Sequence, residues 1–277
     1  MTAPDRDPAT APAALPDFET LLLTRPAPAV LLATLNRPAA SNAFNTQMAR
    51  DLTRLFEDLN LAPGPVRAVV VTGSGTRAFC AGGDLKERHG MSDAAWFAQH
   101  LVYERMVRAL LDCPLPLIGA VNGAAYGGGC ELACAMDFLY VAETARFAQT
   151  EVTLGIIPGA GGTQTLARAV GERRAKELIL TGRPFDAAEA LAWGLANAVY
   201  PQDELLAAAL ATAEAIAANA PVAVRQAKSA IARGLQLSLA DALRFEVEAY
   251  NRTVTTADRR EGVAAFNEKR KADFKGC

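Results

Sequence analysis

The sequence predicts an α/β fold that is followed by a helical C-terminal region. Short apolar runs alternate with amphipathic, helix-like segments up to about residue 200, which is typical of strands alternating with helices. Two of the runs lead into glycine-rich turns that contain Gly83 and Gly128, at the place where α/β sheets usually bind ligands. Beyond Pro201 the chain is rich in alanine, and only helical patterns remain.

Composition limits the possible classes of protein. The chain has 277 residues, of which 51% are hydrophobic, as in an ordinary soluble protein with one large domain. We expect a disordered tail over residues 1–17, because this stretch is rich in alanine and proline. A core follows over residues 18–200, and a helical region over residues 201–277. The net charge of −2 and the interrupted apolar runs argue against nucleic acid or a membrane as partners.

Cysteine and histidine usage indicates the compartment and argues against a metal site. The five cysteines are odd in number and form no C-x-x-C pair, which favours a reducing, cytoplasmic setting. Cys130 and Cys134 are interpreted as small buried apolar groups. With only His89 and His100 present, we expect no histidine-rich metal site.

The elements of the first half are predicted from apolar periodicity and capping residues. A helix should begin near Asn45, and Ser92 should cap a second helix that runs to about Asp112. Pro26 and Pro28 should separate the first two strands. The expected strands span residues 20–24, 29–35, 66–72 and 117–121.

The second half should contain a short helix over residues 131–136, a strand over 138–142 and a helix from Gln164. Asp186 and Glu189 are spaced as in a capping box, and Asp258 and Glu261 repeat that spacing before the last helix. Gly194 fits the end of the helix that begins at Asp186. Helix breaks are expected near Pro221, Gly234 and Ser238.

Gly83 and Gly128 could each present a free backbone N–H at the edge of the sheet. Two such donors that converge on one oxygen make an oxyanion hole, and one donor contributes about 2.7–4 kcal/mol in the transition state. The alternative is that these glycines only allow tight turns. A Gly-Ser-Gly-Thr turn at residues 73–76 lacks the rest of a dinucleotide fingerprint.

Glu131 and Glu151 are acids in apolar surroundings. They could be a helix N-terminal acid and a solvated loop acid. They could instead form a pair in one dry pocket, where both cannot ionise easily and one serves as acid and the other as base. Such a pair suits the addition or removal of water across a double bond.

Several segments together resemble the crotonase superfamily, and within it enoyl-CoA hydratase, over roughly residues 21–276. They are Asn36-Arg37-Pro38 with Asn42-Ala43, residues 78–86, residues 120–131, residues 147–151, residues 154–164, and the ending from Glu261 to Lys271. The resemblance implies a spiral of ββα units with a helical C-terminal trimerisation region. It also implies trimers, or hexamers built as dimers of trimers.

The resemblance further implies roles for single residues. Gly83 and Gly128 would donate to the thioester oxygen of a 2-enoyl-CoA. Glu131 would act as base on the water being added, and Glu151 would deliver a proton to the α-carbon, which gives 3-hydroxyacyl-CoA. No separate cofactor is implied, because coenzyme A is part of the substrate. The implied CoA-binding residues are Ala39, Ala40, Ser41, Ala43, Ala81, Gly82, Asp84, Leu85 and Lys86, with Phe266 and Lys269 from a neighbouring subunit.

Departures from the family pattern leave alternatives open. The loop Ala39-Ala40-Ser41 lacks a basic residue that is often found there, and Thr150 replaces a frequent proline. The stretch from Asp84 to Arg88 and the C-terminal end also resemble methylglutaconyl-CoA hydratases. A Δ3,Δ2-enoyl-CoA isomerase that uses mainly Glu151 is a second possibility. A non-catalytic CoA-ester-binding or RNA-binding oligomer is a third.

Overall fold

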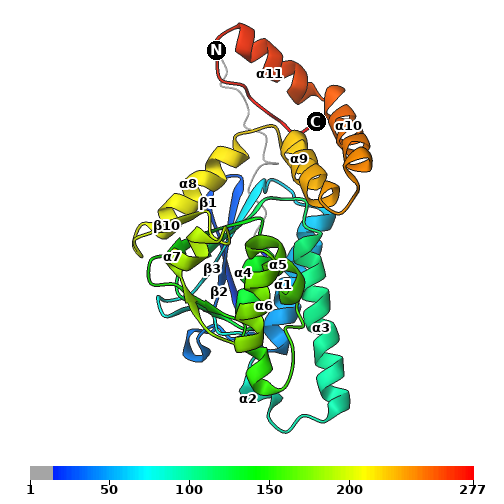
Figure 1. The fold of residues 1–277 in the computed structure, drawn as a ribbon. Helices are drawn as coiled ribbons and strands as arrows, with labels where there is room; N and C mark the ends of the chain where they lie inside the picture. The colour runs from blue at the N-terminus through cyan, green and yellow to red at the C-terminus, as the bar shows by residue number, and fades with distance from the viewer. Residues whose placement is uncertain (1–14) are drawn as a thin grey trace, which may run out of the picture.

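The computed structural model describes residues 15–277, so the tail predicted for residues 1–17 falls almost entirely outside the described residues. Within them the chain forms two stacked sheets with helices packed around them (Figure 1). One sheet has six strands in the order β1-β2-β3-β5-β7-β10. The other has four strands in the order β4-β6-β8-β9.

The six-stranded sheet is parallel except for its first pair, in which β1 runs antiparallel to β2. Its central strands are apolar because both of their faces are covered, and every residue of β3 and β5 is buried. The strands are β1 (Leu21–Ala27), β2 (Val30–Leu35), β3 (Ala68–Gly73), β5 (Leu117–Val121), β7 (Phe138–Ala142) and β10 (Ala198–Tyr200).

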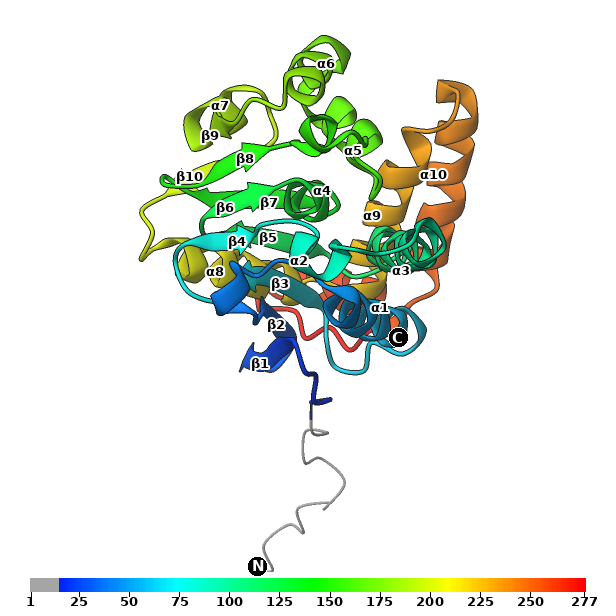
Figure 2. The same cartoon turned by 90° about the horizontal axis from the view of Figure 1, so that it is seen from below.

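The four-stranded sheet is built from very short strands, each of which follows a strand of the larger sheet or a helix. The chain therefore passes from the large sheet to the small one and back through helices (Figure 2), and the small sheet is parallel except for its last pair, in which β9 runs antiparallel to β8. This confirms the predicted spiral of ββα units. The strands are β4 (Ala78–Cys80), β6 (Ala124–Tyr126), β8 (Arg146–Ala148) and β9 (Phe185–Asp186).

The helices begin mostly where the sequence predicts a cap. Asn45 and Ser92 cap α1 and α3, and Asp186 forms a complete capping box with Glu189 at the start of α7. Helices follow the last strand, as predicted. The helices are α1 (Thr46–Leu61), α2 (Leu85–Arg88), α3 (Asp93–Leu111), α4 (Gly128–Cys134), α5 (Gly162–Val170), α6 (Glu172–Thr181), α7 (Ala187–Ala192), α8 (Leu205–Ala217), α9 (Pro221–Gly234), α10 (Leu239–Val254) and α11 (Ala257–Asn267).

Pro26 and Asp258 do not have the roles predicted for them, and α5 begins two residues before the predicted Gln164. Pro26 does not end the first strand but lies inside β1, where an edge position and a register shift between Thr24 and Ala27 tolerate a residue without an N–H. The cap of α11 is Thr256 rather than Asp258. The buried Asp258 carboxylate instead accepts hydrogen bonds from the backbone N–H groups of residues 275 and 276, which anchors the C-terminal segment.

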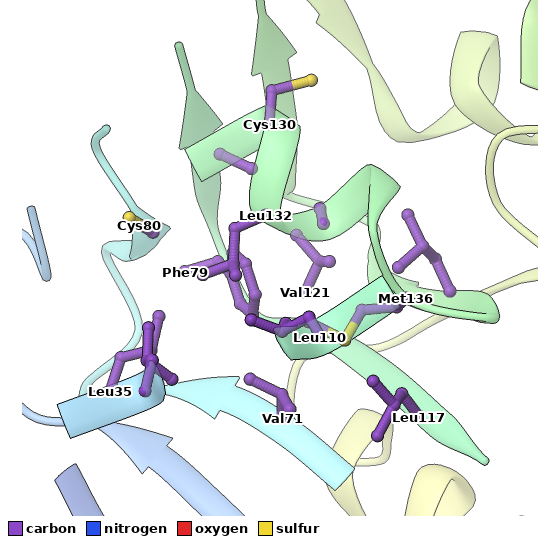
Figure 3. Packing of buried hydrophobic residues seen from close by; sticks show 14 of the residues in the cluster. Leu35, Val71, Phe79, Cys80, Leu110, Leu117, Val121, Cys130, Leu132 and Met136 are labelled. Carbon is purple, nitrogen blue, oxygen red and sulfur yellow. The ribbon is translucent and has the colours of Figure 1, made fainter. Parts of the chain in front are cut away.

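The main core lies between the six-stranded sheet and the helices next to the small sheet. Figure 3 shows Leu110, Leu132 and Met136 gathered beside Val71 and Val121 of the large sheet, and all five are buried. A second cluster fills the space between the other face of that sheet and α8. Because β3 and β5 are packed on both sides, the ends of the strands beside them are held in fixed positions.

No single helix among residues 15–277 has the length and apolar character needed to cross a membrane. The pair α8 and α9 meets the criteria of length and composition only when taken together, and it bends by 108° at its break.

Candidate active site

A cavity of about 410 Å³ opens at the carboxyl ends of β4, β6 and β8. Because these three strands are parallel neighbours, the residues that follow them meet at one edge of the small sheet. Gly83 follows β4, Gly128 follows β6, and Glu151 follows β8. All three line the cavity together with Glu131 from α4.

The N–H groups of Gly83 and Gly128 are free to bind a ligand. Within residues 15–277, neither nitrogen donates a hydrogen bond. The groups on either side of Gly83, the carbonyl of Gly82 and the N–H of Asp84, both pair with the backbone of Phe44. The two turns touch, since a side chain at Gly82 would come within 3.2 Å of the Gly128 nitrogen. Both residues thus face one cavity from adjacent turns.

Close packing leaves no room for a side chain at the first two positions of α4, Gly128 and Gly129. A β-carbon at Gly128 would lie 2.4 Å from the Phe44 ring, and one at Gly129 would lie 1.9 Å from the carbonyl oxygen of Cys80. The helix can therefore begin at Gly128, three residues earlier than predicted, directly against β4. Gly128 consequently presents one of the unpaired N–H groups that every helix leaves at its first turn.

Glu131 is buried on α4, with its carboxylate turned toward the loop that precedes α5. Its Oε1 atom accepts hydrogen bonds from the N–H groups of Ala160 and Gly162, each at 2.8 Å. Burial raises the pKa of Glu131 above its ordinary value, and these N–H groups oppose the rise. The second carboxylate oxygen is left for a ligand.

Glu151 is also buried, at 7% exposure, at the first position of a short 3-10 helix, η3 (Glu151–Leu154). Burial raises its pKa to about 7, and the charge of Glu131 contributes to this rise. A carboxyl with that pKa is partly protonated near neutral pH. Glu131 and Glu151 therefore line one cavity, where N–H groups bind the Glu131 carboxylate and burial favours the protonated form of Glu151.

The predicted CoA-binding segments lie side by side. Ala39 and Ala40 belong to a 3-10 turn, η2 (Pro38–Ala40), and the carbonyl of Ser41 accepts a hydrogen bond from Ala81 at 3.1 Å. Ala43 and Gly82 are buried, Asp84 is half-buried, and Ala81, Leu85 and Lys86 are exposed. Ala81, Gly82 and Leu85 line the cavity.

Phe266 and Lys269 are not brought to this site within the chain. Phe266 is 84% exposed on α11, and neither residue lines the cavity. α11 lies at the far end of the molecule from α2 (Figure 1). A role in CoA binding therefore stays a prediction that requires a neighbouring subunit.

The wall of the cavity opposite the small sheet contains residues that sequence reasoning did not assign. They come from α2 and α3, and the signal available in the sequence was the resemblance of the stretch that ends at Arg88 to methylglutaconyl-CoA hydratases. The guanidinium of Arg88 lies 4.2 Å from the Trp96 ring centroid and 5.0 Å from that of Tyr103. Its Nε donates to Gln99 Oε1 at 2.8 Å. His100 and Phe97 complete this wall.

Within residues 15–277, no group of three or more histidine, cysteine, aspartate or glutamate side chains is placed to hold a metal ion. The described cysteines are unpaired; Cys130 is buried in the core as predicted, whereas Cys134 is only half-buried against it.

Comparison with known proteins identifies relatives along nearly the whole chain. Residues 26–277 match the family model described as enoyl-CoA hydratase/isomerase. A Rhizobium meliloti protein named "Probable enoyl-CoA hydratase" is 45% identical over 260 residues, covering 93% of this chain and 98% of its own. The short-chain-enoyl-CoA hydratase of Clostridium acetobutylicum is 41% identical over 244 residues, covering 88% and 93% of the two chains.

A solved structure shows the same likeness in three dimensions. The crystal structure of enoyl-CoA hydratase from Bacillus anthracis superimposes with a TM-score of 0.91 at 42% identity, and the match covers 94% of this chain and 100% of that one. The resemblance drawn from sequence motifs and the fold class are both confirmed.

Proposed function

The chain belongs to the enoyl-CoA hydratase/isomerase family, and from this premise we propose that it adds water to 2-enoyl-CoA thioesters to give 3-hydroxyacyl-CoA. The observation that carries the proposal is that Gly83, Gly128, Glu131 and Glu151 line one cavity. The proposed reaction uses coenzyme A as part of the substrate and needs no other cofactor.

The proposed oxyanion hole polarises the thioester. The N–H groups of Gly83 and Gly128 donate to the thioester oxygen, which gains negative charge when water attacks the β-carbon. Donors of this kind stabilise the transition state more than the ground state, and each contributes about 2.7–4 kcal/mol. Little reorganisation is needed during the reaction, because close packing against Phe44 fixes Gly128 and a β-bridge to the same residue fixes Gly83.

The two acids divide the proton transfers between them. Ionised Glu131 takes a proton from the attacking water through the carboxylate oxygen that does not bind Ala160 and Gly162. Protonated Glu151 gives its proton to the α-carbon. The buried pair supports this division, because a pKa of about 7 leaves Glu151 partly protonated at neutral pH.

A spectrophotometric assay tests the proposal. The absorbance of the conjugated thioester in crotonyl-CoA should fall when enzyme is added, and Glu131→Gln and Glu151→Gln should each lower kcat by about 10²–10⁴-fold. Binding of the thioester without turnover by the wild type would leave a non-catalytic CoA-ester protein. Rapid double-bond migration in 3-enoyl-CoA that survives Glu131→Gln, with negligible hydration by the wild type, would establish an isomerase.

A more specific candidate, hydration of 3-methylglutaconyl-CoA, is favoured by Arg88. This acyl group ends in a carboxylate, and a guanidinium is the side chain best suited to bind one. Arg88 lines the cavity and takes part in none of the ion pairs that link residues 15–277. Gln99 orients it through Nε, and the Trp96 ring stacks on it. These contacts support a preformed cation in the cavity beside Gly83, where a β-carbon would lie 3.8 Å from the central carbon of the guanidinium.

We also propose assembly into trimers or dimers of trimers in the cytoplasm. Helices α9 and α10 expose a series of large apolar side chains, which a monomer rarely leaves uncovered. Phe97, Leu154 and Ile157 at the cavity are likewise exposed. Light scattering coupled to gel filtration measures the oligomeric state, and a monomer would refute the assembly. The exposed residues on α9, α10 and the segment between them are Ile231, Leu235, Leu237, Leu239, Leu243, Val247 and Tyr250.

A further inference from the structure

Phe44 contacts both of the turns that present the proposed oxyanion donors. It directly precedes Asn45, the cap of α1, and it is only 1% exposed. Its N–H donates to the carbonyl of Gly82 at 2.9 Å, and its carbonyl accepts a hydrogen bond from the N–H of Asp84 at 3.0 Å. These two bonds form a parallel β-bridge that holds Gly83 between them. The backbone of Phe44 therefore fixes the turn that contains the first donor.

The ring of Phe44 packs against the second donor, at the first residue of α4. A β-carbon at Gly128 would lie 2.4 Å from the ring atom Cζ, 2.8 Å from Cε1 and 3.5 Å from Cε2. The outer atoms of the ring thus fill the space beside Gly128, and they limit how closely the start of α4 can approach the turn of Gly83. One side chain and its own backbone therefore contact the two donors separately.

Phe44 is itself held in place by Tyr103 on α3. The two rings meet edge to face, with 4.8 Å between their centroids and an angle of 85° between their planes. The Tyr103 hydroxyl also donates to the carbonyl of Phe44 at 3.3 Å. Because both residues are buried, the Phe44 ring is packed on the side of α3 as well as on the side of α4.

We propose that Phe44 is a positioning residue that sets the spacing between the N–H groups of Gly83 and Gly128, so that both reach one thioester oxygen. This inference rests on the proposed function and adds a residue to it. Phe44 transfers no proton and donates nothing to the substrate. A hydrogen bond weakens steeply when its length or angle departs from the optimum, so a small change in this spacing reduces the stabilisation of the transition state.

The first test is Phe44→Leu, which keeps the backbone bonds but lacks the ε and ζ atoms that pack against residue 128. We expect kcat for hydration of crotonyl-CoA to fall by about tenfold and KM to change by less than about threefold. A second readout is the absorption band of bound 4-dimethylaminocinnamoyl-CoA, which moves to longer wavelength when hydrogen bonds polarise its thioester carbonyl. This red shift requires no proton transfer by Glu131 or Glu151, and it should be smaller in the variant than in the wild type.

A double variant tests whether the two positions are coupled. In Gly128→Ala the new methyl group meets the Phe44 ring, and Phe44→Leu removes the ring atoms that it meets. The double variant should therefore have a kcat at least about tenfold above that of Gly128→Ala, whereas the losses at independent sites would multiply. Losses that multiply, or a Phe44→Leu protein with the kcat and red shift of the wild type, would overturn the inference.

Two further variants separate positioning from a loss of stability. Phe56→Leu makes the same substitution at a fully buried ring of α1 that does not line the cavity, so it should lose thermal stability but keep kcat and the red shift. If Phe44→Leu fails to fold, Phe44→Tyr replaces it, because the added hydroxyl lies on Cζ, the ring atom nearest to residue 128. Unchanged kcat and red shift in Phe44→Tyr would then overturn the inference. A wild type that neither hydrates crotonyl-CoA nor shifts the band would refute the proposed function, and the inference with it.

Discussion

The Nη2 atom of Arg37 lies 2.9 Å from Oδ2 of Asp84, and this ion pair joins the two loops of the predicted CoA groove. Arg37 precedes the η2 turn and also donates to the carbonyl of Ala43. Asp84 follows Gly83 directly and caps α2 through the N–H groups of Lys86 and Glu87. Burial would raise the pKa of Asp84, but the hydrogen bonds from Arg37 and these N–H groups lower it. The pair therefore fixes the loop that contains Gly83.

Replacing Arg37 should weaken substrate binding more than the chemical step. Arg37→Ala frees residues 39–43 and leaves Asp84 without its cation, at a cost of about 1–3 kcal/mol. We expect KM for the thioester to rise by about tenfold with a smaller change in kcat, as measured by steady-state kinetics. Arg105→Ala breaks an exposed ion pair with Glu57 and should change neither value. Equal effects of the two variants would contradict the prediction.

A methyl group at residue 128 should displace the proposed oxyanion donor. In Gly128→Ala the new β-carbon meets the Phe44 ring at 2.4 Å, so the start of α4 must shift. We expect kcat to fall by about 10²–10³-fold, which is the usual effect of losing one such donor. Gly64→Ala is the matched control, because Gly64 also resists substitution, with φ +56°, but has open space around it. That variant should lose some stability, measured by thermal unfolding, and keep its kcat.

The pH profile for hydration should be bell-shaped. Glu151 must hold a proton, so kcat/KM should fall on the alkaline side as the pH rises through its pKa of about 7. Glu131 must be ionised, and because burial raises its pKa, the acid limb should lie above the ordinary glutamate value. The two limbs describe the interacting pair rather than isolated groups. Flat activity from pH 5 to pH 9 would contradict the assignment.

The raised pKa of Glu151 also means that this residue destabilises the folded protein at neutral and higher pH. Its pKa is raised from 4.5 to about 7, so between these values the folded state binds a proton that the unfolded state has released. The free energy of unfolding therefore decreases as the pH rises through this range, by about 3 kcal/mol at most. Glu151→Gln should be more stable than the wild type at pH 8 by about 1–3 kcal/mol in urea unfolding.

The gain from Glu151→Gln should disappear near pH 4, where the carboxyl is protonated in both states. Glu57→Gln serves as the comparison, because a hydrogen bond from Arg105 lowers the pKa of Glu57. That variant should not be stabilised at pH 8. A Glu151→Gln protein that is less stable than the wild type at pH 8 would show that burial of the ionised Glu151 carboxylate does not destabilise the fold.

Long periodic elements and capped helices could be predicted from the sequence. Asn45, Ser92 and Asp186 cap helices as expected, because a side-chain cap is a local interaction between residues a few positions apart. The strands of the small sheet, which have two or three residues each, were missed because such segments are too short to show a period. Thr256 rather than Asp258 caps α11, because Asp258 bonds to residues 17 and 18 positions later in the sequence.

Candidate site residues could be predicted from the sequence only where the residue type is unusual for its local sequence. Glycines before a helix and acids in apolar company identified Gly83, Gly128, Glu131 and Glu151. Their shared cavity depends on three parallel strands that pair across long sequence separations. Arg88 had no such chemical signal, since an arginine in an α/β protein usually lies on the surface, and it stood out only as the end of a stretch that resembles methylglutaconyl-CoA hydratases.

Arg88 should determine which acyl groups the cavity accepts. Its Nε is held by Gln99, and Gln99 in turn donates to Glu87 and Thr46 at 2.8 Å, so the guanidinium is fixed before a ligand binds. A carboxylate on the acyl group would pair with it, and a hydrogen bond to a charged group contributes about 1.5–3 kcal/mol. We therefore expect kcat/KM for glutaconyl-CoA or 3-methylglutaconyl-CoA to exceed that for crotonyl-CoA.

Arg88→Met should reverse this preference. The variant keeps the contact with Trp96 but loses the charge, so kcat/KM for the carboxylated thioesters should drop by about 10- to 100-fold. The value for crotonyl-CoA should stay within about threefold or rise, because an apolar wall suits an apolar acyl group. Arg108→Met, on the exposed surface of α3, is the control and should alter neither substrate. A wild type that prefers crotonyl-CoA, or an equal loss with both substrates in Arg88→Met, would show that Arg88 supports the cavity wall rather than selecting the acyl group.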